Sequence, residues 1–153
     1  MKKKNWWIGV CLAVLLTLLV VPVQLQTSAA EDDAAANALK GQYALSHTVK
    51  LYVPSTVNGN IPITDEAHQK FVDEALAQLS TWFGGATSVE GKGAWVDDKK
   101  TLIKEKVTIV YAYADKLDRN AIDQVVSYAK KMKKELGQSS IALEVDGKMY
   151  FIE

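Results

Sequence analysis

Glu105 is the residue in this sequence whose position best suits it for chemistry. It shares strand parity with Ile103 and Val107, so a strand through this segment would direct a carboxylate toward the same face as apolar side chains. A carboxylate on a buried face is costly unless it is paired or protonated. Two interpretations follow: Lys104, Lys106 or another basic neighbour satisfies the charge in a structural network, or Glu105 lines a pocket and acts as a general base.

Four aromatic residues fall on segments that would flank Glu105 in a sheet: Tyr52, Trp95, Tyr111 and Tyr113. Such side chains commonly cover a sheet as part of its core. Their rings are apolar while their polar tips can reach water, so they also suit a partner surface or an aromatic-lined cleft. We therefore expect Trp95, Tyr111 and Tyr113 to be binding residues beside Glu105.

Other kinds of site lack suitable residues in the sequence. The two histidines, His47 and His68, show no H-x-x-x-H or E-x-x-H spacing, and a surface or capping role is expected for both. The glycines of 84–85 and 91–93 do not open a helix, so they lack the amide cradle of a phosphate site. We predict no metal site and no cofactor.

Residues 1–30 have the three-part pattern of a secretory signal peptide. Three lysines precede a long apolar run, and Ser28 and Ala30 supply the small side chains of a cleavage site before Glu31. An uncleaved membrane anchor is the alternative, because the run approaches the roughly 18 residues that can begin to span a bilayer. In either case we expect the rest of the chain to be secreted or held at the cell envelope.

Removal of this segment changes the composition of the chain. The whole sequence has 18 basic and 18 acidic residues, and residues 1–30 hold three of the lysines and none of the acids, which leaves a net charge of −3. That balance argues against binding to nucleic acid. The only cysteine, Cys11, is removed as well, so disulfides, zinc–cysteine sites and thiol nucleophiles are not expected.

The sequence after the signal peptide divides into a tether and one small domain. Residues 31–46 are rich in alanine and acid and are expected to form a flexible tether. Residues 47–153 carry the alternation of strands and the periodicity of helices. The predicted elements are strands over 47–53, 86–96, 101–114, 140–145 and 148–152, helices over 65–83 and 119–136, and a loop over 54–62.

Local signals fix the ends of these elements and the fold class. Thr64 and Asp118 are the expected helix N-caps, and a glycine follows each helix. The glycines at 91 and 93 suggest a bend or bulge in their strand, and Asp146-Gly147 is a hairpin signal. The order of elements predicts an α+β, ferredoxin-like βαββαβ fold, an antiparallel sheet with two helices on one face, plus a short C-terminal hairpin.

Taken together, several of these features resemble an uncharacterised bacterial family, a domain of unknown function made of small and often exported ferredoxin-like proteins. The elements that match the pattern of this family are Gly85, Thr87, Gly93, Trp95, Glu105, Gly137 and Gln138. The resemblance covers about His47 to Val145, and the chain departs from it at Leu136, where an aromatic residue is usual. It implies that Glu105, Trp95 and Gln138 form one polar site on the sheet.

These observations favour a non-enzymatic exported domain that binds a small molecule or a partner protein through its sheet at the cell envelope. A homodimer fits this interpretation, because a second subunit often covers the exposed face of a ferredoxin-like sheet. An uncleaved N-terminus would add a membrane tether. The alternative is a small dimeric enzyme of the α+β-barrel type, in which Glu105 is a general base beside Trp95, Tyr111 and Tyr113 in a closed cavity.

Overall fold

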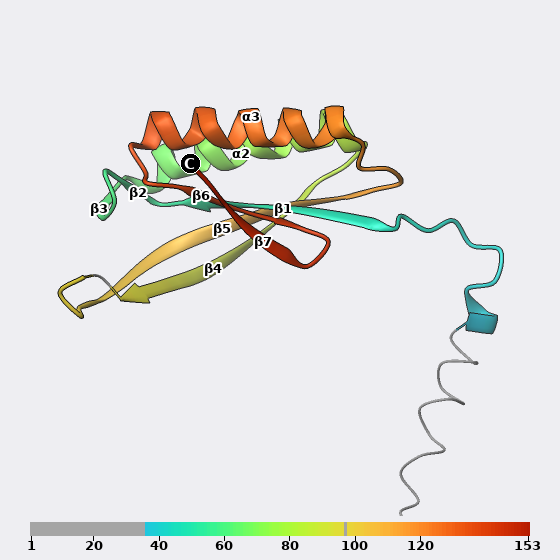
Figure 1. The fold of residues 1–153 in the computed structure, drawn as a ribbon, viewed down its shortest axis with the longest axis horizontal. Helices are drawn as coiled ribbons and strands as arrows, with labels where there is room; N and C mark the ends of the chain where they lie inside the picture. The colour runs from blue at the N-terminus through green and yellow to red at the C-terminus, as the bar shows by residue number, and fades with distance from the viewer. Residues whose placement is uncertain (1–35, 97) are drawn as a thin grey trace, which may run out of the picture. The chain divides into compact units, whose positions relative to one another are not determined.

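The structure is a computed structural model that describes residues 36–96 and 98–153 (Figure 1). The expected signal peptide over residues 1–30 lies outside the described residues, as does the first part of the expected tether. Residues 36–46 are exposed throughout. In the part of the chain that the structure describes, no helix combines the length and the apolar character needed to cross a membrane.

A five-stranded antiparallel sheet carries the two long helices on one of its faces (Figure 1). In spatial order the strands are β4 (Thr87–Val96), β5 (Leu102–Ala114), β1 (His47–Pro54), β6 (Ile141–Val145) and β7 (Lys148–Ile152). The helices are α2 (Asp65–Phe83) and α3 (Arg119–Leu136). Chain order and sheet confirm the predicted ferredoxin-like fold, and β7 is the second strand of the predicted C-terminal hairpin.

Both helices begin and end where local chemistry favours it. The hydroxyl of Thr64 accepts a hydrogen bond from the amide of the third helical residue at 3.2 Å, and the carboxylate of Asp118 does the same at 2.9 Å. These bonds satisfy amides that have no partner inside the helix. Gly84 and Gly137 then close the helices with φ of 85° and 59°, a conformation that glycine adopts at little cost.

The core lies between the sheet and the helices. Alternate residues of β1, namely Val49, Leu51 and Val53, are fully buried there, and burial of each such side chain contributes roughly 1.5–3 kcal/mol. Val110 of β5 and Met132 of α3 complete the same layer. Every core residue belongs to the compact unit of residues 43–153, so this unit contains the packing that it needs to fold alone.

Two details of the predicted local structure are corrected. The sequence predicts a bend or a bulge at Gly91 and Gly93, and the continuous register between β4 and β5 from Thr87 to Val96 excludes the bulge. Neither glycine has a positive φ, so both continue the strand in the ordinary extended conformation. The expected loop over 54–62 contains a small two-stranded ribbon, β2 (Thr56–Val57) and β3 (Ile61–Pro62).

Strand β5 is longer than its inner neighbour. β1 pairs with β5 only from Val107 to Ala114, whereas β4 pairs with β5 down to Leu102. The segments 92–96 of β4 and 102–106 of β5 therefore project beyond β1 as a two-stranded ribbon, which we call the arm (Figure 1).

Candidate binding site on the open sheet face

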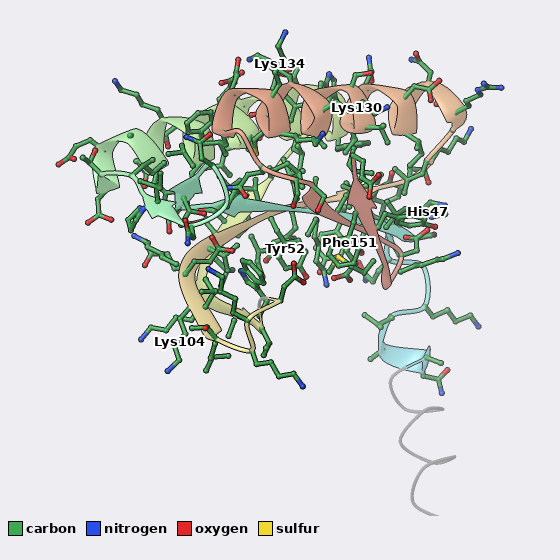
Figure 2. The ribbon with its side chains drawn as sticks, turned by 60° about the vertical axis from the view of Figure 1, so that its left-hand side comes forward. His47, Tyr52, Lys104, Lys130, Lys134 and Phe151 are labelled. Carbon is green, nitrogen blue, oxygen red and sulfur yellow. The ribbon has the colours of Figure 1, made fainter. Side chains whose placement is uncertain are left out.

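The face of the sheet turned away from α2 and α3, which we call the open face, has no helix over it among the described residues. Figure 2 shows Tyr52 on this side of the sheet, opposite the α3 side with Lys130 and Lys134. By strand register the open face carries Thr87, Val89, Gly91, Gly93 and Trp95 of β4, Glu105, Val107, Ile109, Tyr111 and Tyr113 of β5, Lys50 and Tyr52 of β1, Ala142 and Glu144 of β6, and Met149 and Phe151 of β7. The face is therefore largely apolar and aromatic.

Two glycines leave a gap in this face, between Val89 and Trp95 of β4. A Cβ added at Gly91 would make only ordinary van der Waals contacts, and one added at Gly93 would lie 3.6 Å from Cγ of Glu105. Packing within the chain therefore does not require glycine at either position, and neither does the backbone. Glycine weakens a strand interior and often marks the place where a ligand or another backbone approaches closely. We call the space over Gly91 and Gly93 the glycine gap.

The carboxylate of Glu105 borders the glycine gap and is held by hydrogen bonds from two other segments. The hydroxyl of Thr56 in β2 donates to Oε2 of Glu105 at 2.8 Å. The amide Nε2 of Gln138 donates to the carbonyl and the hydroxyl of Thr56 at 2.7 and 3.1 Å. Oε1 of Glu105 lies 3.9 Å from the position of a Cβ on Gly93, so the second oxygen is directed at the gap.

The residues that hold Glu105 are themselves fixed by the end of α3. The amide of Asn58, in the turn between β2 and β3, donates to the carbonyl of Leu136 at 2.9 Å. A Cβ on Gly137 would displace the amide oxygen of the Asn58 side chain, and the positive φ of Gly137 independently favours glycine. The next residue, Gln138, is thereby placed against Thr56.

A second polar group lies at the centre of the open face. Nζ of Lys50 and the hydroxyl of Tyr52 contact the two oxygens of Glu144 at 2.8 and 3.0 Å. The hydrogen bond from Lys50 lowers the pKa of the Glu144 carboxyl, and the same bond raises the pKa of Lys50. Burial and then the bond to Glu144 raise the pKa of Tyr52. Both oxygens of Glu144 are occupied, which makes this group a structural acceptor.

The C-terminal hairpin is tied to the start of β1 by Asp146. Its carboxylate lies 2.8 Å from Nδ1 of His47 and accepts from the amide of Thr48 at 2.8 Å. These bonds, the one to His47 first, lower the pKa of Asp146. A shallow depression of about 590 Å³ lies here and is lined by Ser46, His47, Thr48, Lys50, Tyr113, Glu144, Asp146 and Gly147. Its charged groups already pair with one another, so it serves chiefly to join the hairpin to the sheet.

The expected surface or capping role is wrong for one of the two histidines. His68 is 2% exposed, and its Nε2 lies 3.3 Å from the carbonyl oxygen of Val53. The first turn of α2 packs on β1, which places this position on the inner side of the helix. His47 is half-exposed, as expected of a surface residue. Over residues 36–96 and 98–153, no three His, Cys, Asp or Glu side chains are arranged to hold a metal ion.

The residues predicted for the site separate into two groups along β5. Glu105 and Gln138 are joined through Thr56, and Trp95, 46% exposed, lies two positions from Gly93 on the same face of β4. The rings of Tyr111 and Tyr113 form an edge-to-face pair with centroids 5.9 Å apart. Tyr113 is eight positions from Glu105, roughly 26 Å along a strand, so the tyrosine pair lies outside the glycine gap.

The sequence does not indicate that Thr56 belongs to the site or that the two strand glycines form a gap. Thr56 lies in a segment expected to be a loop, and no local pattern indicates that its hydroxyl reaches Glu105, 49 positions away. The sequence shows Gly91 and Gly93 as a spaced pair of glycines. This pattern alone fits a bulge as well as a close approach of a ligand. The continuous register of β4 is what changes their meaning.

Comparison with known proteins places the chain in a family. Residues 48–150 match the family described as a protein of unknown function, DUF3574. The chain belongs to this family. The expected resemblance to an uncharacterised domain family is thereby confirmed. No curated protein is similar to this DUF3574 chain.

Two solved structures share the fold of this DUF3574 domain. One is a phage SAM lyase in the apo state, 17% identical, with a TM-score of 0.53, covering 72% of this chain and 91% of the other. The second is a phage SAM lyase in complex with S-methyl-5'-thioadenosine, 16% identical, with a TM-score of 0.55, covering 72% and 94%. At these identities the likeness establishes the α+β fold alone.

Proposed function

We propose that this DUF3574 domain is an exported, non-enzymatic module of the cell envelope that binds a small organic ligand in the glycine gap. The signal peptide expected over residues 1–30 would export it, and residues 31–46 would separate it from an uncleaved anchor. One observation carries the proposal: two strand glycines that the chain does not itself require lie beside an oriented carboxylate. Larger residues at these positions would give a more stable strand, so an occupant that approaches the backbone closely would explain the two glycines.

The chemistry around the gap defines the kind of ligand. Oε1 of Glu105 accepts hydrogen bonds, and a bond from an amine or hydroxyl to a charged carboxylate is among the stronger ones. The half-exposed ring of Trp95 and the side chain of Val89 provide apolar walls at the two ends of the gap. A ligand with a flat or apolar body and an amino or hydroxyl group therefore fits.

Adenosyl compounds are the first probes to test. Their adenine ring is flat and carries an amine, which matches the gap. A phage SAM lyase with the same fold is described in complex with S-methyl-5'-thioadenosine, and this supports that compound and S-adenosylmethionine as probes for this chain.

The test is calorimetric titration of residues 31–153 with each probe, for the wild type and three variants. We expect Glu105→Gln to weaken binding by about 10- to 100-fold, the range of a hydrogen bond to a charged group. Gly93→Ala should weaken binding by at least about 10-fold while stabilising the fold by ~0.4–1 kcal/mol, since alanine suits this backbone better than glycine. Gly85→Ala, where a Cβ meets nothing within 4 Å, is the matched control and should bind normally.

Two outcomes of this titration would contradict the proposal. One is that neither probe binds the wild-type domain at millimolar concentration. The other is binding that Gly93→Ala and Glu105→Gln leave unchanged, since the ligand would then lie elsewhere on the domain.

A small enzyme that uses Glu105 as general base is the second candidate. It is favoured by the hydrogen bond from Thr56, which fixes one oxygen of Glu105 and leaves the other directed at the gap. Chromatography of S-adenosylmethionine incubated with the domain separates the two candidates. Consumption that Glu105→Gln abolishes supports the enzyme, whereas binding without consumption supports the module.

A further inference from the structure

The open face carries exposed apolar side chains on both of its edge strands, β4 and β7. A row of apolar side chains crosses it: Val89 lies opposite Ile109, Ile109 lies opposite Tyr52, and Phe151 lies opposite Ala142 on the far side. The two ends of the row are exposed, Val89 by 51% and Phe151 by 69%. Contiguous apolar patches of this kind mark interaction surfaces, whereas single exposed apolar residues need no explanation.

The arm adds a second reason to expect a cover. A two-stranded ribbon is at best marginally stable in water, yet residues 92–96 and 102–106 extend beyond β1, where Ser55 and Thr56 contact β5 only at the base of the arm. Trp95, near the end of β4, is 46% exposed on the open face of the arm. Contact with another surface would stabilise this ribbon.

The size of the open face suits a protein interface. With strands about 4.8 Å apart and residues about 3.3 Å apart, five strands with about six residues each give roughly 480 Å² in projection. Protruding side chains make the accessible area larger, on the order of the ~800 Å² that each partner buries in a standard interface.

The charged pair at the centre of the open face allows a second copy of the same chain as the partner, and Glu105 lies away from this centre, beside the glycine gap. Lys50 and Glu144, the charged pair at its centre, neutralise each other within one chain, so two identical faces meet there without net repulsion. A two-fold interface joins one surface patch to the same patch on the other subunit and therefore requires such self-complementarity. We infer that two copies of this domain pack open face against open face, and that each copy covers the glycine gap of the other.

The dimer is inferred from the apolar row and the arm. Only the claim that the second copy covers the glycine gap rests on the proposed function. Sedimentation equilibrium of residues 31–153 tests the dimer with two residues of the same type and strand. Val89 lies on the open face, whereas Val96, seven positions along β4, lies on the opposite face with a similar exposure. Val89→Glu places two like charges in the interface and should raise the Kd of the dimer at least ~100-fold. Val96→Glu should leave that Kd within about 3-fold of the wild type.

A second pair of variants lies away from the gap on β7. Phe151→Glu is on the open face and should weaken the dimer, whereas Tyr150→Glu, on the other face of the same strand, should not. Circular dichroism of all four variants checks that they are folded. A wild-type domain that stays monomeric at millimolar concentration overturns the inference, and so do Val89→Glu and Val96→Glu variants with equal effects on the dimer.

Titration of S-methyl-5'-thioadenosine into Phe151→Glu tests the closure of the gap separately. If the second copy covers the gap, this variant should bind the probe less tightly than the wild type, and saturating probe should tighten the wild-type dimer by the square of that factor, because each dimer has two gaps. If the wild type dimerises but does not bind the probe, the proposed ligand is refuted and the inferred dimer is not. Probe binding of equal strength in the monomeric variant refutes the closure.

Discussion

The two faces of the central sheet carry similar apolar side chains but differ in what covers them. On the helix side, Val49, Leu51 and Val53 of β1 have no exposed surface. On the open face, Tyr52 of the same strand is half-buried, and Val89 and Phe151 at the margins are largely exposed. The two helices cover the first face, whereas over residues 36–96 and 98–153 no helix covers the apolar surface and the glycine gap of the second (Figure 1). This difference supports our proposal that the open face is the binding surface.

The largest expected effect compares stability on the two faces. Leu51→Ala creates a cavity in the core and should lower the free energy of unfolding by ~2–5 kcal/mol. Val89→Ala, at a dilution where the domain is monomeric, should change it by less than about 0.5 kcal/mol, as expected for a surface position. Urea denaturation of residues 31–153 measures both. Equal losses would show that the open face already belongs to the core of one chain.

A smaller effect concerns acid stability and the ion pair on the open face. The pKa of Glu144 is lowered in the folded domain, mainly by Lys50. The ionised Glu144 therefore stabilises the fold above about pH 4.5, the ordinary pKa of a glutamate. This stabilisation is lost as the pH falls through the lowered pKa. Asp146 behaves in the same way because His47 lowers its pKa. Glu144→Gln should therefore reduce the drop in Tm between neutral and strongly acid pH.

The control for the acid experiment is a carboxylate of the helix layer. Asp73 accepts a hydrogen bond from Gln69 on the exposed side of α2. Asp73→Asn should leave the acid-induced drop in Tm unchanged. If Glu144→Gln left the drop as large as in the wild type, the ion pair with Lys50 would contribute nothing to stability.

The fold could be predicted in detail because its signals are local. The caps at Thr64 and Asp118 and the hairpin at Asp146-Gly147 depend on residues adjacent in the chain. The alternation of Val49, Leu51 and Val53 likewise specifies which face of β1 is buried. Patterns of this kind act over one or two turns or a single strand, and a single sequence contains them fully.

The candidate site could be predicted only in part because it depends on distant segments. Glu105 was identified from its strand parity, but its partner Thr56 becomes visible only when β2 is seen beside the arm. The burial of His68 depends on how α2 packs on β1, which helical periodicity does not specify. The sequence also does not predict that the open face lacks a cover. Alternation distinguishes the two faces of a strand, but it does not indicate whether another element packs on the face turned away from the core.

The central claim is that the open face is a binding surface, and fluorine NMR of tryptophan tests it most directly. Residues 31–153 contain two tryptophans, Trp95 on the open face and Trp82, which packs against the core and serves as the internal reference. After labelling with fluorotryptophan, the Trp95 resonance should shift as protein concentration rises or S-methyl-5'-thioadenosine is added, while that of Trp82 stays in place. A Trp95 resonance that remains at the position of a solvent-exposed indole under both conditions would contradict the account.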